Sequence, residues 1–263
     1  MINNAIYSFW SNKGETSCGF CCKPHFINFL NESVTRTKKF FKNVIIYTDN
    51  HGYEMLNPHI DCEYVIFDFD SYEYTKYFWN YPKLLTYAAQ KEPFLHIDTD
   101  IILYDKPDTN MYTADFVCER YHVDKWTRNS KLFSNLLYHT DKIYTSGIFG
   151  GNNLKLFDIL LKSADYYIGE VIEDIKNGKL PDFPDLVSIE ELSMTNIIET
   201  QFLNKNGKQF NIYNFSDYYN NLLNPEIKSN RYFAHLYGTN KREIHIDDDV
   251  IFKLNLEGES KDK

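Results

Sequence analysis

The sequence predicts an α/β fold in which helices cover both faces of a β-sheet. The chain has 263 residues, 43% of them hydrophobic and 25% charged, which is enough to bury a large core. Segments 44–47 and 64–67 are continuous runs of β-branched and aromatic residues, which are typical of strands buried on both faces. Such runs alternate with helical patterns, and this alternation indicates an α/β sheet.

The first half of the chain contains most of these signals. Residues 11–16 form a polar turn after the first buried run, and Pro82 stands where the first turn of a helix tolerates proline. Glu92 and Pro93 then end the helical pattern. We expect strands over 5–10, 43–49, 64–67 and 94–97, and helices over 24–41 and 83–90.

The second half has longer helices and shorter strands. We expect strands over 115–118, 144–149, 210–215 and 232–236, and helices over 154–175 and 189–202. Gly150 and Gly151 are expected to close the second of these strands. The segment 178–185, with Pro181 and Pro184, is the best candidate for a mobile loop, and residues 241–263 form a charged peripheral end, frayed over 258–263.

Charge and hydropathy exclude several classes of protein. Lysine and arginine number 28 against 37 aspartates and glutamates, a net charge of −9, which argues against a nucleic-acid partner but leaves room for a local phosphate pocket. No apolar run approaches the roughly 18 residues of a membrane span, and the N-terminus lacks the features of a signal peptide. The five cysteines are an odd number, which fits reduced thiols. We therefore expect a cytoplasmic protein, with peripheral membrane association left open.

Two carboxylates follow the apolar segment 94–97. Asp98 and Asp100 are two positions apart, so in an extended backbone both side chains project to the same side and reach one cation. Oxygen ligands of this kind suit Mg²⁺ or Mn²⁺, and a metal beside a diphosphate neutralises a leaving group. The carboxyl end of a strand in an open α/β sheet is also where ligands bind.

At this point the sequence resembles nucleotide-sugar glycosyltransferases of the GT-A fold, whose Asp-x-Asp motif follows a buried strand. The segment 233–241 is similar to the His-x-x-Gly-x-x-Lys signature of glycosyltransferase family 8, with His235, Gly238 and Lys241 in its three positions. The resemblance implies that His235 completes a metal site with Asp98 and Asp100, and that Gly238 and Lys241 hold the diphosphate. The family continues with Pro-Trp, whereas this chain has Arg242 and Glu243.

The resemblance also implies a fold and an activity. The fold would be a single Rossmann-like GT-A domain over 1–263, with a mixed, mainly parallel sheet flanked by helices. Residues 1–105 would bind the nucleotide, 106–245 would face the acceptor, and 246–263 would be a peripheral tail. The activity would be Mn²⁺- or Mg²⁺-dependent transfer of a hexose, with UDP-hexose as donor and a glycan, lipid-linked or protein acceptor, as in bacterial polysaccharide biosynthesis.

Weaker matches complete the expected donor site. The segment 145–148 is similar to the family's Asn-small-Gly-Val stretch in the sugar pocket, and Lys83 is placed like a basic residue near the donor sugar. Segments 7–10 and 48–49 lie where this fold binds the base and ribose. The residues expected to bind donor are Tyr7, Phe9, Trp10, Asp49, Lys83, Asp98, Thr99, Gly147, Gly238 and Lys241.

The catalytic group is open on sequence grounds. The segment 191–196 resembles the family's Asp-Gln-x-x-x-Asn stretch, but Leu192 stands where a glutamine faces the anomeric carbon. Glu190 or Glu191 would then approach the reaction centre, with Lys241 on the diphosphate, and we expect retention of configuration in preference to inversion. Alternatively, the two glutamates are acidic residues that stabilise a helix N-terminus.

Two other readings stay open. A haloacid-dehalogenase-type phosphatase also opens with Asp-x-Asp after an apolar strand, and Asp247 to Asp249 resemble its late acidic pair. However, 97 residues precede Asp98, whereas that nucleophile lies near the start of its core. A non-catalytic sugar-binding module is the other reading. Binding of a nucleoside diphosphate that requires Mn²⁺ would separate the transferase from both.

Overall fold

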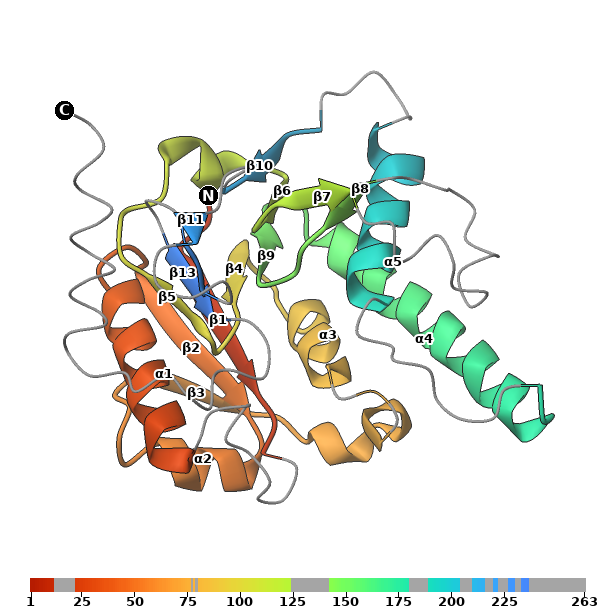
Figure 1. The fold of residues 1–263 in the computed structure, drawn as a ribbon, viewed down its shortest axis with the longest axis horizontal. Helices are drawn as coiled ribbons and strands as arrows, with labels where there is room; N and C mark the ends of the chain where they lie inside the picture. Colours follow the sequence, from red (N-terminus) through yellow and green to blue (C-terminus); the bar gives the residue numbers. More distant parts are fainter. Residues whose placement is uncertain are drawn as a thin grey trace.

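The structure is a computed structural model that describes most of the chain. The described residues are 1–11, 22–76, 78, 80–123, 142–179, 189–203, 210–215, 220–221, 227–229 and 233–236. Figure 1 shows a central sheet with helices on both sides of it. Residues 180–185 of the loop predicted over 178–185, residues 12–16 of the turn predicted over 11–16 and the end of the chain from 241 lie outside the described residues.

The main sheet has seven strands in the order β10-β6-β9-β4-β1-β2-β3. β9 runs antiparallel to both of its neighbours, and all other neighbouring pairs are parallel. This mixed, mostly parallel sheet confirms the predicted α/β, Rossmann-like fold class. Its strands are β1 (Asn4–Phe9), β2 (Asn43–Thr48), β3 (Glu63–Ile66), β4 (Phe94–Ile97), β6 (Phe116–Cys118), β9 (Ile148–Gly151) and β10 (Ile212–Asn214).

Two apolar clusters cover the two faces of this sheet. One cluster joins the sheet to α1 (Lys23–Thr37) and α2 (Asn50–Leu56). The other joins it to α3 (Tyr81–Ala88), α4 (Lys155–Lys176) and α5 (Ile189–Ile197). Successive side chains of β1 alternate between the clusters, as the period of a strand requires. Figure 1 shows α1 at the left of the sheet and α3 and α4 at the right.

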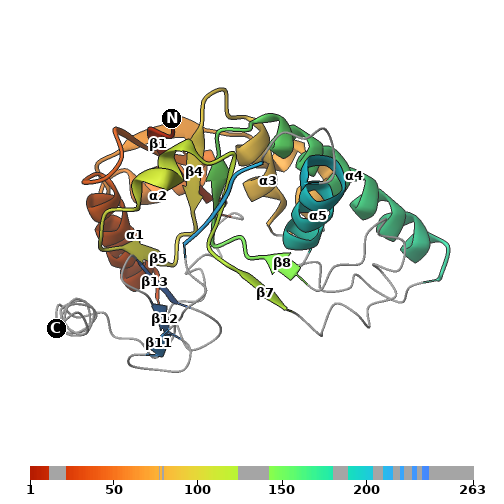
Figure 2. The ribbon, with the colours of Figure 1, turned by 90° about the horizontal axis from the view of Figure 1, so that it is seen from above.

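A second, antiparallel sheet brings the end of the described chain back to the centre. Its order is β11-β12-β13-β5, and Figure 2 shows β5, β13, β12 and β11 lying side by side in that order. β13 pairs with β5 so that His235 lies opposite Ile101. The strands are β5 (Ile101–Leu103), β11 (Asn220–Asn221), β12 (Ile227–Ser229) and β13 (Phe233–Leu236). This register places β13 directly beside the residues that follow the Asp-x-Asp segment.

The remaining elements are short. β7 (Tyr121–Val123) and β8 (Lys142–Tyr144) form an antiparallel pair. Single turns of 3₁₀ helix lie at Phe69–Ser71, Glu73–Lys76 and Thr109–Thr113, and a π-helical segment covers Ile198–Leu203. Within the described residues, no helix is both long enough and apolar enough to cross a lipid bilayer.

Three predicted elements differ from the structure. The helix expected over 24–41 ends at Thr37, and the one expected over 189–202 changes to π-helical geometry at Ile198. The strand expected over 144–149 is two strands, β8 and β9, separated by a turn at residues 146–147. The helix α2 has only seven residues and is absent from the prediction; Asp49 is its N-cap, and the Asp49 carboxylate accepts the backbone N–H of Gly52.

Candidate functional site

Asp98 and Asp100 lie in the tight turn that joins β4 to β5. All four residues of β4 are buried, so the strand is fixed and the turn emerges at its carboxyl end. The backbone N–H of Asp98 donates to the carbonyl of Gly147 at 2.9 Å, and the N–H of Ile101 donates to the carbonyl of Asp98 at 3.1 Å. Both aspartates are therefore placed by backbone bonds at the edge where ligands bind in α/β sheets.

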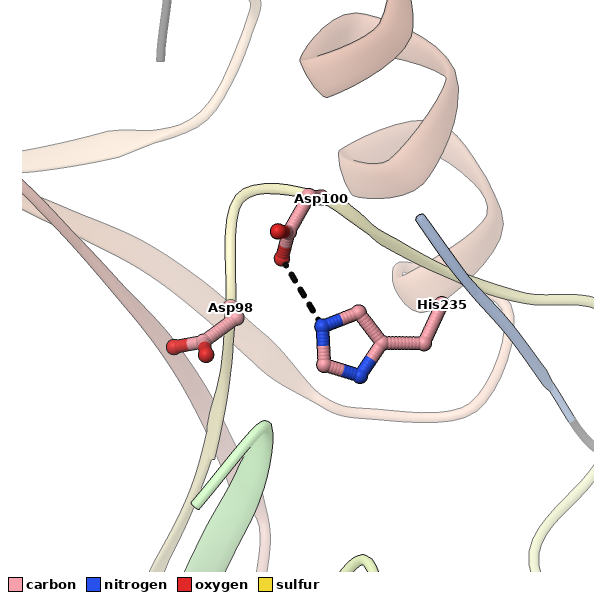
Figure 3. A group of neighbouring side chains, drawn as sticks. All are labelled: Asp98, Asp100 and His235. Carbon is pink, nitrogen blue, oxygen red and sulfur yellow. Dashed lines mark ion pairs between the residues drawn. The ribbon is translucent and has the colours of Figure 1, made fainter. Parts of the chain in front are cut away.

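His235 joins the two aspartates from the other end of the chain. Its Nε2 lies 3.4 Å from Oδ1 of Asp100, and one ligand atom from each of the three residues lies within 4.8 Å of the other two. Figure 3 shows the imidazole pointing at the aspartate turn from a separate strand. These three residues form an acidic and histidine cluster that could hold a metal ion. The pairing of β13 with β5 explains how residues so distant in sequence meet here.

The other ring nitrogen of His235 faces Glu119. Its Nδ1 lies 3.1 Å from Oε2 of Glu119, a carboxylate that follows β6 and is completely buried. Burial lowers the pKa of His235, but the charges of Glu119 and Asp100 outweigh it and raise the pKa to about 10. In the absence of a metal, His235 is therefore protonated at neutral pH and pairs with both carboxylates.

Lys83, on α3, lies on the other side of Asp98. Its Nζ is 2.7 Å from Oδ1 of Asp98 and 3.4 Å from Oε2 of Glu190, and it donates to the carbonyl of Ser146 at 3.1 Å. Burial lowers the pKa of Lys83, but the charges of Asp98 and Glu190 outweigh it, so the pKa lies above its ordinary value. Lys83 is therefore a fixed positive charge at the cluster.

Two carboxyls of the site have raised pKa values. Burial raises the pKa of Asp98 to about 7; the charge of Lys83 opposes this rise and that of Asp100 adds to it. Burial also raises the pKa of Glu191 to about 7, although the carboxylate accepts the backbone N–H of Ser146 at 2.8 Å. Both groups therefore titrate near neutral pH.

Glu190 is placed differently from its neighbour. It is completely buried and accepts hydrogen bonds from Tyr87 Oη at 2.7 Å and Asn80 Nδ2 at 3.3 Å. Together with its ion pair to Lys83, these contacts make Glu190 a support for the lysine. Glu190 is thus buried beside Lys83, and the expectation that Glu190 or Glu191 approaches a reaction centre stays a prediction.

The structure also corrects two residues of the predicted nucleotide site. The hydroxyl of Tyr7 bonds to Ser33 and Thr37 inside the α1 face of the core, and the side chain has no exposed surface. Phe9 is 2% exposed and packs on Phe26 with ring centroids 5.1 Å apart. Both point into the sheet–helix interface, so neither side chain is available to a nucleotide.

The other predicted donor residues have varied surroundings. The carboxylate of Asp49 caps α2 and accepts the hydroxyl of Ser11 at 2.6 Å, which gives it a structural role. Trp10 and Thr99 are both partly exposed, Thr99 in the Asp-x-Asp turn itself. Gly147 lies beside the side chains of His235 and Glu119. Gly238 and Lys241 lie outside the described residues.

Sequence reasoning missed two buried groups of the site. Glu119 directly follows the strand β6, and an acidic residue at a strand end is the same signal that identified Asp98. His96 in β4 is 1% exposed, with Nε2 at 2.9 Å from Ser8 Oγ and Nδ1 at 3.7 Å from Asp98. Burial and the nearby charge of Lys83 hold the pKa of His96 well below its ordinary value, so it is neutral.

Together these features define an α/β protein with a candidate metal-binding cluster at the carboxyl edge of its main sheet. Residues 4–259 match the model of a family of unknown function, DUF6734. The chain therefore belongs to this family. A comparison with curated proteins gave no match.

Proposed function

We propose that this protein is a glycosyltransferase that uses Mn²⁺ or Mg²⁺ to move a hexose from a nucleotide-diphosphate sugar to a glycan, lipid-linked or protein acceptor, with UDP-hexose as the donor. The observation that carries the proposal is the convergence of Asp98, Asp100 and His235 from two separate strands. The segments 98–100 and 233–241 each resemble a GT-A motif. Because the two motifs are separate stretches of the sequence, each resemblance supports the proposal independently of the other.

The donor set fits a divalent cation. Two carboxylates and an imidazole are ligands that suit Mn²⁺, and the carboxylates also suit Mg²⁺. Burial has raised the pKa of Asp98 to about 7, which means that its negative charge is costly where it is. Asp98, Asp100 and His235 would hold a cation that relieves this cost and that would supply positive charge to a diphosphate leaving group.

The neighbouring residues have roles consistent with sugar transfer. Lys83 holds Asp98 in place and adds a positive charge at the edge of the cluster. Glu191, with a pKa of about 7, is the carboxyl best suited to accept a proton from an acceptor hydroxyl if transfer proceeds with inversion. From the family resemblance we expect retention.

The test is a screen of the full chain against nucleotide sugars. Release of the nucleoside diphosphate should require Mn²⁺ or Mg²⁺, be abolished by a chelator, and be strongest with UDP-hexoses. NMR of the product anomer then separates retention from inversion. Hydrolysis of phosphate monoesters with no turnover of any nucleotide sugar would overturn the proposal in favour of a phosphatase.

A further inference from the structure

The two ring nitrogens of His235 face carboxylates on opposite sides. Nε2 lies 3.4 Å from Asp100, and Nδ1 lies 3.1 Å from Glu119. Glu119 has no exposed surface, and His235 is 6% exposed, so this pair is shielded from water. A hydrogen bond in such surroundings fixes the ring more firmly than one at the surface.

The chemistry of imidazole makes this arrangement directional. A neutral ring carries one N–H and one lone pair, and an ionised carboxylate accepts hydrogen bonds but donates none. With a metal ion in place of the Nε2 proton, the nitrogen that faces Glu119 would keep its hydrogen, and the lone pair of Nε2 would point toward the side of Asp100. A ligating histidine whose other nitrogen donates to a carboxylate is both oriented and made more basic.

The backbone around Glu119 is tied to the aspartate turn. The N–H of Thr145 donates to the carbonyl of Arg120 at 2.8 Å, and the carbonyl of Gly147, two residues further on, accepts the N–H of Asp98 at 2.9 Å. The same turn therefore positions the carboxylate on one side of the imidazole and the aspartates on the other.

Gly147 makes room for the contact. A Cβ at this position would lie 2.2 Å from Oε2 of Glu119 and 2.6 Å from Cε1 of His235. Only a residue without a side chain allows the carboxylate and the ring to meet here. The sequence predicts that Gly147 lies in the sugar pocket, whereas the structure places it where a Cβ would meet these two side chains.

The geometry points to Glu119 as a positioning residue that holds His235 with Nε2 aimed at the metal position between Asp98 and Asp100. This inference rests on the metal site of the proposed function but not on sugar transfer. Glu119 lies outside every sequence motif, so the sequence alone does not indicate this role.

The experiment uses the full chain and Mn²⁺ alone. Pulsed EPR of bound Mn²⁺ detects the ¹⁴N coupling of a ligating imidazole, and calorimetry gives the affinity. In the wild type we expect the ¹⁴N coupling. Glu119→Ala should lose it and bind Mn²⁺ about 10–100-fold more weakly. Glu119→Gln, which keeps an acceptor oxygen, should retain the coupling with a smaller loss of affinity.

The control is Glu199→Gln, since Glu199 is a partly buried glutamate that accepts a hydrogen bond from Tyr144 at 3.3 Å, outside the cluster. This control should bind Mn²⁺ as the wild type does. If Glu119→Ala does not fold, the ¹⁴N coupling and the Mn²⁺ affinity are measured in Glu119→Gln and Glu119→Asp instead. The inference then requires a changed ¹⁴N coupling in Glu119→Asp.

The outcomes separate this inference from the proposed function. A ¹⁴N coupling that persists unchanged in Glu119→Ala, or in Glu119→Asp if the alanine variant does not fold, overturns the positioning role and leaves the metal site intact, even if affinity falls. The absence of ¹⁴N coupling in the wild type shows that His235 is not a ligand. This result overturns both the positioning role of Glu119 and the three-residue metal site of the proposed function. A coupling that is present in the wild type and lost in Glu119→Ala supports the inference whether or not any nucleotide sugar is turned over.

Discussion

Replacement of Lys83 by methionine tests the electrostatic structure of the site without reference to its function. Methionine keeps most of the volume and removes the charge. Lys83 pairs with Asp98 at 2.7 Å and with Glu190 at 3.4 Å, and its side chain is 11% exposed. The variant leaves two carboxylates near one another, one of them with a side chain only 1% exposed.

The magnitude follows from the charge that remains buried. Removing one partner of a buried ion pair costs about 3–5 kcal/mol, because the other charge is left without compensation. We expect the lower part of that range, since Asp98 is 25% exposed and Glu190 keeps its hydrogen bonds from Tyr87 and Asn80. For a chain of this size the melting temperature should fall on the order of 10 °C.

The loss should depend on pH in a defined direction. Asp98 has a pKa of about 7, so it is mostly ionised at pH 8 and mostly protonated at pH 5. A protonated Asp98 no longer pairs with Lys83, so the difference in stability between wild type and Lys83→Met should be larger at pH 8 than at pH 5.

The assay is denaturant unfolding of both proteins at the two pH values, with Lys179→Met as the matched control. Lys179 also forms a lysine–aspartate pair, 2.8 Å from Asp174, but its side chain is 67% exposed. An exposed pair contributes little to stability, so the control should unfold as the wild type does. Equal losses in the two variants, or a Lys83→Met loss that grows on acidification, would refute the reasoning.

Four further outcomes are expected. Asp100→Asn should weaken Mn²⁺ binding at least tenfold, by about 1.4 kcal/mol or more, in calorimetry, with an unchanged circular dichroism spectrum. Mn²⁺ binding at pH 7.5 should release about one proton, because His235 has a pKa of about 10 and must lose the Nε2 proton to ligate. The affinity for Mn²⁺ should therefore fall on acidification. Calorimetry in buffers of different ionisation enthalpy measures the proton release. Gly147→Ala should destabilise the fold by about 1–3 kcal/mol and weaken Mn²⁺ binding, since its Cβ would overlap Glu119. Gly169→Ala, on α4, should be neutral or stabilising by up to about 1 kcal/mol in the same unfolding assay, because its Cβ meets only Tyr74 Oη at 3.4 Å.

The parts of the fold that the sequence predicts are those with local signals. The continuous apolar runs of β1, β2 and β4 are strands within about one residue of the expected ends, because burial on both faces requires such runs. The spacing of Asp98 and Asp100 after β4 is also a local pattern. The structure adds His235 to them through the pairing of β13 with β5, which the sequence motif suggested but strand periodicity does not specify.

The errors have equally physical causes. Alternation along β1 shows that successive side chains point to opposite faces of the sheet, but it does not show which helix covers each face. The prediction therefore places Tyr7 and Phe9 at a ligand, whereas α1 covers them. The turn at residues 146–147 has the local turn signal Ser-Gly between two short apolar runs, and its long-range contacts with Asp98 and Lys83 hold it in place. Glu119 belongs to no motif, and its meaning depends on a partner 116 residues away.

The cost of assembling this cluster is itself an argument for a ligand. Among the described side chains, two cationic groups, Lys83 and His235, lie against a larger set of acidic ones: Asp98, Asp100, Glu119, Glu190 and Glu191. The raised pKa values of Asp98 and Glu191 show that the fold holds these charges at a loss. Apolar residues of similar volume would stabilise such a position. These raised pKa values, together with the convergence of three ligand atoms, support the proposal that a divalent cation binds here, because its charge and its preferred ligands would offset the cost.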